Sequence, residues 1–195
     1  RDSTEDTDDD NDNIQDSSDD CQTGVKGWTS SSITDYDSDG CNDASEDDDD
    51  DGDSVSDSVD ACIKGNLAWI STQFTDYDSD GCQDTTEDQD DDNDGYSDLV
   101  DLCSKGELNW DANNDDYDSD GCHDGLEDSD DDNDGIADDL DACSIGHLSW
   151  ISGASNDYDN DGCFDSTEDE DDDNDGIYDD IDSCAKGDKA WTSAL

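Results

Sequence analysis

The chain has 195 residues, of which 66 are Asp or Glu and only 6 are Lys or Arg, so its formal net charge is -60. This charge excludes a nucleic-acid partner, because phosphate groups would be repelled, and an anionic membrane surface would repel the chain as well. No apolar run approaches transmembrane length, so membrane insertion is not expected.

Charge and hydropathy alone are typical of a disordered chain, but the cysteines and aromatic residues argue against disorder. Five Trp and six Tyr are too many for an acidic tail. Nine cysteines in an acidic chain, spaced regularly, indicate an oxidising compartment outside the cell. The cysteines are Cys21, Cys41, Cys62, Cys82, Cys103, Cys122, Cys143, Cys163 and Cys184.

The chain is a repeat array with a period of 40–41 residues, which the tryptophans at 28, 69, 110, 150 and 191 mark. Each repeat contains a Trp segment, a first acidic loop ending in Glu and a second acidic loop ending in Asp. In chain order we expect a partial repeat at 1–20, full repeats at 21–61, 62–102, 103–142 and 143–183, and a partial repeat at 184–195. Both ends fall inside a repeat, which predicts either a window of a longer array or a subunit whose ends meet further copies.

The first loops follow the calcium-loop pattern D-x-D-x-D-G with an acid at place 12. In "DYDSDGCNDASE", residues 35–46, acids occupy places 1, 3, 5, 9 and 12, and place 6 is a glycine that permits a positive φ. Three alternate carboxylates face one side of a cation, and the acid at place 12 closes the shell. The predicted ligands are Asp35, Asp37, Asp39, Asp43 and Glu46; Asp76, Asp78, Asp80, Asp84 and Glu87; Asp116, Asp118, Asp120, Asp124 and Glu127; and Asp157, Asp159, Asp161, Asp165 and Glu168.

The second loops repeat this pattern with Asp at place 12. Place 6 is Gly except in two loops, which carry Asn13 and Ser54. Asn tolerates a positive φ better than Ser, so we expect the loop at 49–60 to be distorted. The predicted ligands are Asp8, Asp10, Asp12, Asp16 and Asp19; Asp49, Asp51, Asp53, Asp57 and Asp60; Asp90, Asp92, Asp94, Asp98 and Asp101; Asp130, Asp132, Asp134, Asp138 and Asp141; and Asp171, Asp173, Asp175, Asp179 and Asp182.

Nine loops in one register predict about nine or more bound Ca²⁺ ions. Calcium is favoured over magnesium because the oxygen donors are many and all come from the protein. Zinc is not expected, since no two cysteines lie close in the sequence. Nine divalent ions leave a formal charge of -42. The place-9 carboxylates and the acids that follow place 12 in the first loops therefore predict a second ion between loops. Those acids are Asp47, Asp88, Asp128 and Asp169.

The loops follow one another too closely for the flanking helices of an EF-hand. After Glu87 the chain reads "DQDDDNDG", which lacks an apolar face, and we expect at most a helical turn around "SDLVD" at 97–101. The predicted fold class is therefore mostly irregular, with little helix or strand.

The runs "DQDDDNDGYSDLVDLC", "DSDDDNDGIADDLDAC" and "DEDDDNDGIYDDIDSC" resemble thrombospondin type 3 repeats. The resemblance covers nearly the whole chain and implies an elongated, calcium-wrapped array stapled by disulfides. Two features depart from the animal pattern: the first-loop cysteines stand at place 7, and segments such as "KGNLAW" replace proline-rich connectors. The pattern is closer to repeats of microbial secreted and surface proteins.

By the same resemblance, disulfides join the cysteines that flank each Trp segment. The implied pairs are Cys21–Cys41, Cys62–Cys82, Cys103–Cys122 and Cys143–Cys163, with Cys184 left over. A pairing across the two loops of a repeat is the alternative, and it leaves Cys21 unpaired.

Each repeat offers little apolar material, namely one Trp, one Tyr and the residues at places 7 and 11, so metal ions and disulfides must replace an ordinary core. We expect each Trp to pack against the disulfide and the Tyr, and His123 and His147 to be solvated. The chain has no nucleophile–base set and no phosphate-binding loop, so it is not expected to be an enzyme. Two functions remain: a calcium-stabilised extracellular fibre, stalk or spacer, or a cell-surface adhesion module that recognises a glycan or protein through the Trp segments.

Overall fold

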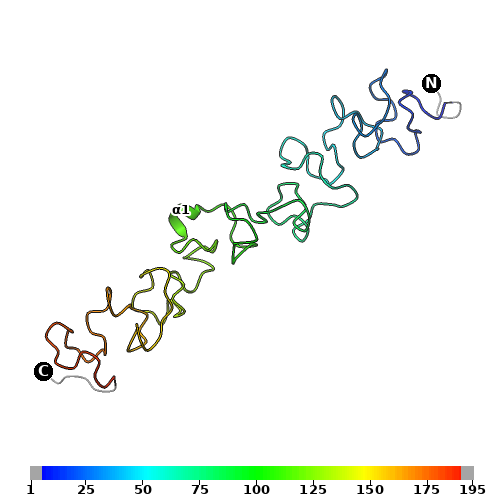
Figure 1. Cartoon of the computed structure of the whole chain (residues 1–195). Coiled ribbons are helices and arrows are strands. Elements are labelled where there is room, and N and C mark those ends of the chain that lie inside the picture. Colours follow the sequence, from blue (N-terminus) through cyan, green and yellow to red (C-terminus); the bar gives the residue numbers. More distant parts are fainter. Residues whose placement is uncertain (1–5, 190–195) are drawn as a thin grey trace. The chain divides into compact units, whose positions relative to one another are not determined.

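A computed structural model describes residues 6–189. The chain divides into two compact parts, one up to Asp92 and one from Asn93 onward. Within the described residues both parts are turns and loops, without strands and with one short helix, α1 (Ala112–Asp115) (Figure 1). The expected irregular, loop-dominated and disulfide-stapled fold is thereby confirmed. Residues 1–5 of the first partial repeat and residues 190–195 of the last, including Trp191, lie outside the described residues.

Helix α1 is a capped version of a turn that ends the other three fully described Trp segments as well. Asp111 precedes it, and the Asp111 side chain accepts a hydrogen bond from the Asn113 backbone N–H, which is the usual role of an N-cap aspartate. The corresponding turn of repeat 21–61 has the backbone hydrogen bond from Asp35 N to Ser31 O at 2.9 Å, which matches the bond from Asp115 N to Asp111 O at 3.1 Å in α1. Residues 97–101 form a hydrogen-bonded turn, so the helix lies in a Trp segment and not in the "SDLVD" stretch.

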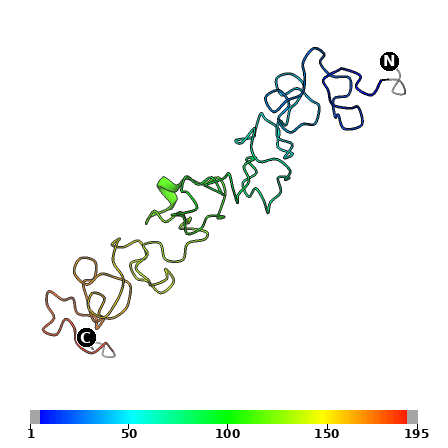
Figure 2. The same cartoon turned by 45° about the vertical axis from the view of Figure 1, so that its right-hand side comes forward.

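All nine loops have a positive φ at the same two positions, places 4 and 6, and the loops follow one another along the chain (Figure 2). Place 6 has a positive φ in every loop, and Ser54 at 82° lies close to Gly40 at 92°. The expected distortion of loop 49–60 is therefore wrong, because Ser54 accepts the left-handed conformation despite its side chain. Place 4 also has a positive φ in every loop, and it is occupied by Asn, Ser or Gly, which are among the residues that tolerate it best.

Aspartates fill the interior in place of apolar side chains. Within residues 6–189 the buried hydrophobic residues are Cys41, Cys82, Cys122 and Cys163 alone, whereas many aspartates are buried completely. The place-11 residues are exposed, as Leu140 at 74% shows. The place-11 residues therefore do not form a small apolar core within the repeats.

Four disulfides anchor this interior, and they join the pairs that the resemblance implies. The bonds are Cys21–Cys41, Cys62–Cys82, Cys103–Cys122 and Cys143–Cys163, and Cys184 is free and exposed. Each closes a Trp segment into a ring of about 20 residues, which is worth about 3 kcal/mol in the chain-entropy model.

Candidate metal centre

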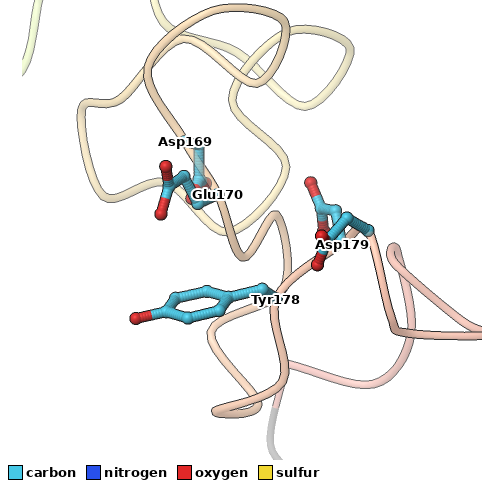
Figure 3. Close-up of a pocket in the computed structure, with 5 residues that line it drawn as sticks. Asp169, Glu170, Tyr178 and Asp179 are labelled. Atoms are coloured by element: carbon cyan, nitrogen blue, oxygen red, sulfur yellow. The ribbon is translucent and has the colours of Figure 1, made fainter.

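Place 9 closes eight of the nine loops at the base, including loop 171–182, where the Asp179 backbone N–H donates to Glu170 O at 2.8 Å (Figure 3). In loop 49–60 the Asp57 backbone N–H donates to Asp48 O at 2.9 Å, and Asp57 Oδ1 accepts from Asp50 N at 2.9 Å. The first loops do the same, since Asp43 Oδ1 accepts from Tyr36 N at 3.0 Å. One oxygen of a place-9 carboxylate is thus held by the loop, and Oδ2 is the oxygen left for a cation.

The second loops gather carboxylate oxygens that have no hydrogen-bond donor. In loop 49–60 the side chains of Asp49, Asp51 and Asp53 place oxygens within 4.8 Å of one another. Asp53 is fully buried, and its Oδ1 accepts from Val55 N at 2.7 Å. Asp49 Oδ1, Asp53 Oδ2 and Asp60 Oδ2 are buried without a partner. Places 1, 5 and 12 therefore each offer one free oxygen, as a hard cation requires.

The same three places recur in loop 130–141. Asp130 Oδ1, Asp134 Oδ2 and Asp141 Oδ2 are buried and unpartnered. Loop 8–19 leaves Asp12 Oδ2 and Asp19 Oδ2 in that state. Buried polar atoms are rarely left without a partner in folded proteins, so this recurring set of carboxylate oxygens fits a bound cation. Loop 90–101 contributes residues to both parts of the chain, and its ligand set stays a prediction.

Burial raises the pKa of several of these carboxyl groups, and neighbouring carboxylates raise it further. The pKa of Asp53 is raised to about 6 by burial first, then by the charges of Asp51 and Asp49. Burial likewise raises the pKa of Asp60 and of Asp134 to about 6. A divalent ion inside such a cluster reverses this effect, because it favours the ionised carboxylate.

The first loops bring together the acids at places 1, 3 and 5, and at place 12 Glu46 Oε1 is buried without a partner. Asp35, Asp37 and Asp39 place oxygens within 4.8 Å of one another. Glu46, at place 12, turns one oxygen to the Trp segment, where Oε2 accepts from Val25 N at 2.7 Å. Asp47, the next residue, lies close enough for its charge to raise the pKa of Asp39, after the larger effect of burial. Its Oδ2 is buried and unpartnered, so Asp47 is a candidate ligand of the first loop too.

In each of two repeats, an asparagine at place 4 of the second loop donates hydrogen bonds to two aspartates of the first loop. Asn133, at place 4 of a second loop, donates from Nδ2 to Asp118 and, at 3.0 Å, to Asp120 Oδ2. Its left-handed backbone is what a place-4 residue needs to sit there. The pKa of Asp118 is raised to about 7, mainly by burial and by Asp120. Glycine at place 4 in loop 49–60 leaves the corresponding Asp37 without this amide.

Adjacent loops are packed through the glycines of the first loops. A Cβ on Gly81 would lie 2.6 Å from Cγ of Asp60, and a Cβ on Gly40 would lie 2.7 Å from Cγ of Asp19. The place-12 carboxylate of one loop therefore occupies the space that glycine leaves in the next loop. Place 6 of the first loops requires glycine for two reasons, namely its positive φ and this close contact with the aspartate. The sequence pattern reveals only the first reason.

In three repeats the tyrosine at place 2 of the first loop bonds to the start of the next repeat. Tyr36 Oη donates to Gly65 O at 2.9 Å, and Gly65 N donates to Asp51 Oδ2 at 2.7 Å. Tyr117 makes the equivalent bond to Gly146 O at 2.8 Å. In these repeats the glycine three residues after the next cysteine thus links a first loop with a second loop, a role that periodic spacing alone does not reveal.

The Trp segments pack on the residue that follows the first-loop cysteine. The ring centroids of Trp110 and His123 lie 5.1 Å apart, and those of Trp150 and Phe164 lie 4.9 Å apart. The expectation of a solvated His123 is therefore wrong, because this side chain supports the indole ring.

No helix among the described residues has the length and hydropathy to cross a bilayer. Four disulfides within the chain fit an oxidising environment. No protein-family model and no curated protein matches the chain.

Proposed function

We propose that the chain is a calcium-binding structural repeat protein of the thrombospondin type 3 kind. The observation that carries this proposal is the recurring set of buried, unpartnered carboxylate oxygens at places 1, 5 and 12 of loops 49–60 and 130–141. A chain with almost no apolar core needs another source of cohesion, and cations among these oxygens supply it.

Calcium fits better than magnesium because every donor is a protein oxygen and each loop brings several carboxylates. Magnesium keeps most of its waters and uses few carboxylates. Residues around each loop would bind the ion with one carboxylate oxygen each, while backbone N–H groups hold the other oxygen, as Val55 N does for Asp53.

The biological role we propose is that of an extracellular fibre, stalk or spacer. Two features support it: the disulfides, and hydrogen bonds that run from one repeat to the next, such as Tyr36 to Gly65. In repeat arrays the free energy of folding is approximately the sum of the stability of each repeat and of the interfaces between neighbouring repeats. Additional repeats therefore lengthen the protein without requiring a new hydrophobic core.

The test is a binding measurement followed by imaging. Equilibrium dialysis should find about one Ca²⁺ per loop at concentrations where Mg²⁺ does not compete, and negative-stain electron microscopy in calcium should show extended particles or filaments. Failure to retain calcium above nonspecific counterion levels would contradict the proposal, and compact particles would contradict the spacer role alone.

A second candidate function rests on the Trp segment of repeat 143–183. Trp150, Leu148 and Ile151 line an open hollow of about 570 Å³ together with Asp118 and Asp132, and the Trp150 Nε1–H has no partner. An indole face with polar neighbours is a surface on which a sugar ring could stack. Glycan-array binding that is lost in Trp150→Ala, with calcium loading unchanged, would support the adhesion role.

A further inference from the structure

A second type of acidic cluster lies between the two loops of a repeat, and we name it the inter-loop cluster. In repeat 21–61 it consists of Asp43 from place 9 of the first loop, Asp47, and Asp50 from place 2 of the second loop. Their oxygens lie within 4.8 Å of one another. Asp43 keeps only Oδ2 for this cluster, because its Oδ1 accepts from Tyr36 N.

A cationic side chain already occupies this position in two repeats. Lys64 Nζ contacts Asp43 Oδ2 and lies 3.2 Å from Asp50 Oδ2. Lys186 Nζ contacts Asp165 Oδ2 in the same way and lies 3.3 Å from Asp172 Oδ2. Both lysines stand two residues after a cysteine.

Each lysine is held from the repeat that precedes it. Lys64 Nζ lies 5.7 Å from the centre of the Tyr36 ring, and Lys186 Nζ lies 5.8 Å from the centre of the Tyr158 ring. The tyrosine face attracts the ammonium group, and the place-2 tyrosine itself belongs to the loop that supplies the place-9 aspartate. The ammonium group is therefore positioned at the cluster by several contacts.

One ammonium group does not satisfy the cluster. Asp50 is 5% exposed and Asp172 is 6% exposed, yet the Oδ1 atom of each is buried without a partner. Asp47 Oδ2 is in the same state. The cluster thus has the oxygen donors and the enclosure of a site for a more highly charged cation than the one it contains.

Repeat 103–142 has the same cluster without a lysine. Asp131 lies among the charges of Asp124, Asp128 and Asp138. Asp131 Oδ1 and Asp128 Oδ2 are buried and unpartnered. The residue at the lysine position is Ile145, which is 60% exposed and brings no charge. These carboxylates face no ammonium group from that position.

We propose that the inter-loop cluster is an additional cation site whose occupant is set by the second residue after the next cysteine. A lysine there, Lys64 or Lys186, supplies an ammonium group. Where Ile145 stands, a divalent oxygen-preferring ion binds instead. This inference rests on the proposed function, since it adds ions to a chain that already binds them in its loops.

The experiment exchanges the two residue types and counts ions. Equilibrium dialysis with ⁴⁵Ca²⁺ is run on the full chain at an ionic strength of about 0.15 M, where loosely attracted counterions are screened. Ile145→Lys is expected to lower the stoichiometry by one ion, and Lys64→Ile is expected to raise it by one. Ile33→Lys is the matched control, because it adds the same charge on a side chain that is 83% exposed and should leave the count unchanged.

The outcomes separate this inference from the proposed function. A wild-type chain that retains no calcium overturns both. A wild-type chain that loads its loops while both exchanges leave the count unchanged overturns the inter-loop site alone. A loss of one ion in Ile33→Lys as well would assign the effect to net charge and also overturn it. If Ile145→Lys does not fold, Lys64→Ile decides the question: one additional ion supports the inter-loop site, and an unchanged count overturns it.

Discussion

Removal of divalent ions should expand the chain at neutral pH, because the loops then contain unbalanced charge. In loop 49–60 the oxygens of Asp49, Asp51 and Asp53 lie within 4.8 Å of one another. Two unit charges at about that separation repel by about 3.5 kcal/mol at an effective dielectric constant of about 20. Three ionised carboxylates make three such pairs, so one loop stores about 10 kcal/mol of repulsion.

The disulfides are too weak to offset this repulsion. Each contributes about 3 kcal/mol, and each ring contains a Trp segment and the first half of a first loop but leaves the second loop 49–60 outside, so nothing covalent holds the carboxylates of that loop together. We therefore expect the calcium-free chain to keep its four rings and to lose the ordered loops between them.

The assay is chelation with EGTA at pH 7, followed by small-angle scattering and limited proteolysis under non-reducing conditions. The radius of gyration should increase and cleavage should appear within the loops, and both changes should reverse when calcium is restored. An unchanged radius and cleavage pattern, in a sample shown by atomic absorption to hold no divalent ion, would refute the reasoning.

Three further predictions concern single groups. Gly81→Ala should weaken calcium binding in two neighbouring loops, because its Cβ would meet Asp60; Gly27→Ala, with φ 97° but open space around it, is the control, and equal losses in calorimetric titrations would contradict the contact. Asp53→Asn should remove one bound ion yet make the calcium-free chain more compact, since it deletes a buried charge; a chain that expands more than wild type on chelation would oppose this. The pH dependence of the calcium-free chain follows from the raised pKa of Asp53, about 6 when folded against 3.8 unfolded. The folded carboxyl group binds its proton more tightly, so this stabilisation is fully present below pH 3.8 and is lost as the pH rises through about 6. The calcium-free chain should be compact at pH 4 and expanded at pH 7, and scattering curves that do not change between these values would contradict the assignment.

The sequence sufficed for the features that depend on local spacing. Acids at places 1, 3 and 5 and a glycine at place 6 dictate a tight loop whatever surrounds it, and the structure places Asp35, Asp37 and Asp39 together as that spacing predicts. The absence of strands from the described residues also follows, since the chain has no alternating apolar run.

Contacts between loops were beyond the reach of the sequence pattern, because they depend on how one loop packs on the next. Nothing local predicts that Asp60 fills the space at Gly81, or that Glu46 bonds to the Trp segment through Val25. The intrinsic backbone preference of serine disfavours the positive φ that Ser54 adopts. Its neighbours override that preference, since Asp49 Oδ2 accepts from Ser54 N at 3.1 Å and Val55 N is fixed by Asp53.

The place-12 carboxylate of a second loop packs against the place-6 glycine of the first loop that follows it, and this contact fixes how successive loops sit on one another. Asp60 both leaves Oδ2 for the cation that we propose in loop 49–60 and fits beneath Gly81 of loop 76–87. Loss of the cation frees the Asp60 carboxylate to repel its neighbours, and the backbone of the following loop then loses its support. The one-residue deletion in the array falls between loops 90–101 and 116–127, in the Trp segment before Tyr117, inside the ring that the Cys103–Cys122 disulfide closes. The contact between successive loops is kept there, since a Cβ on Gly121 would lie 2.7 Å from Cγ of Asp101, so the Trp segment absorbs the change of length.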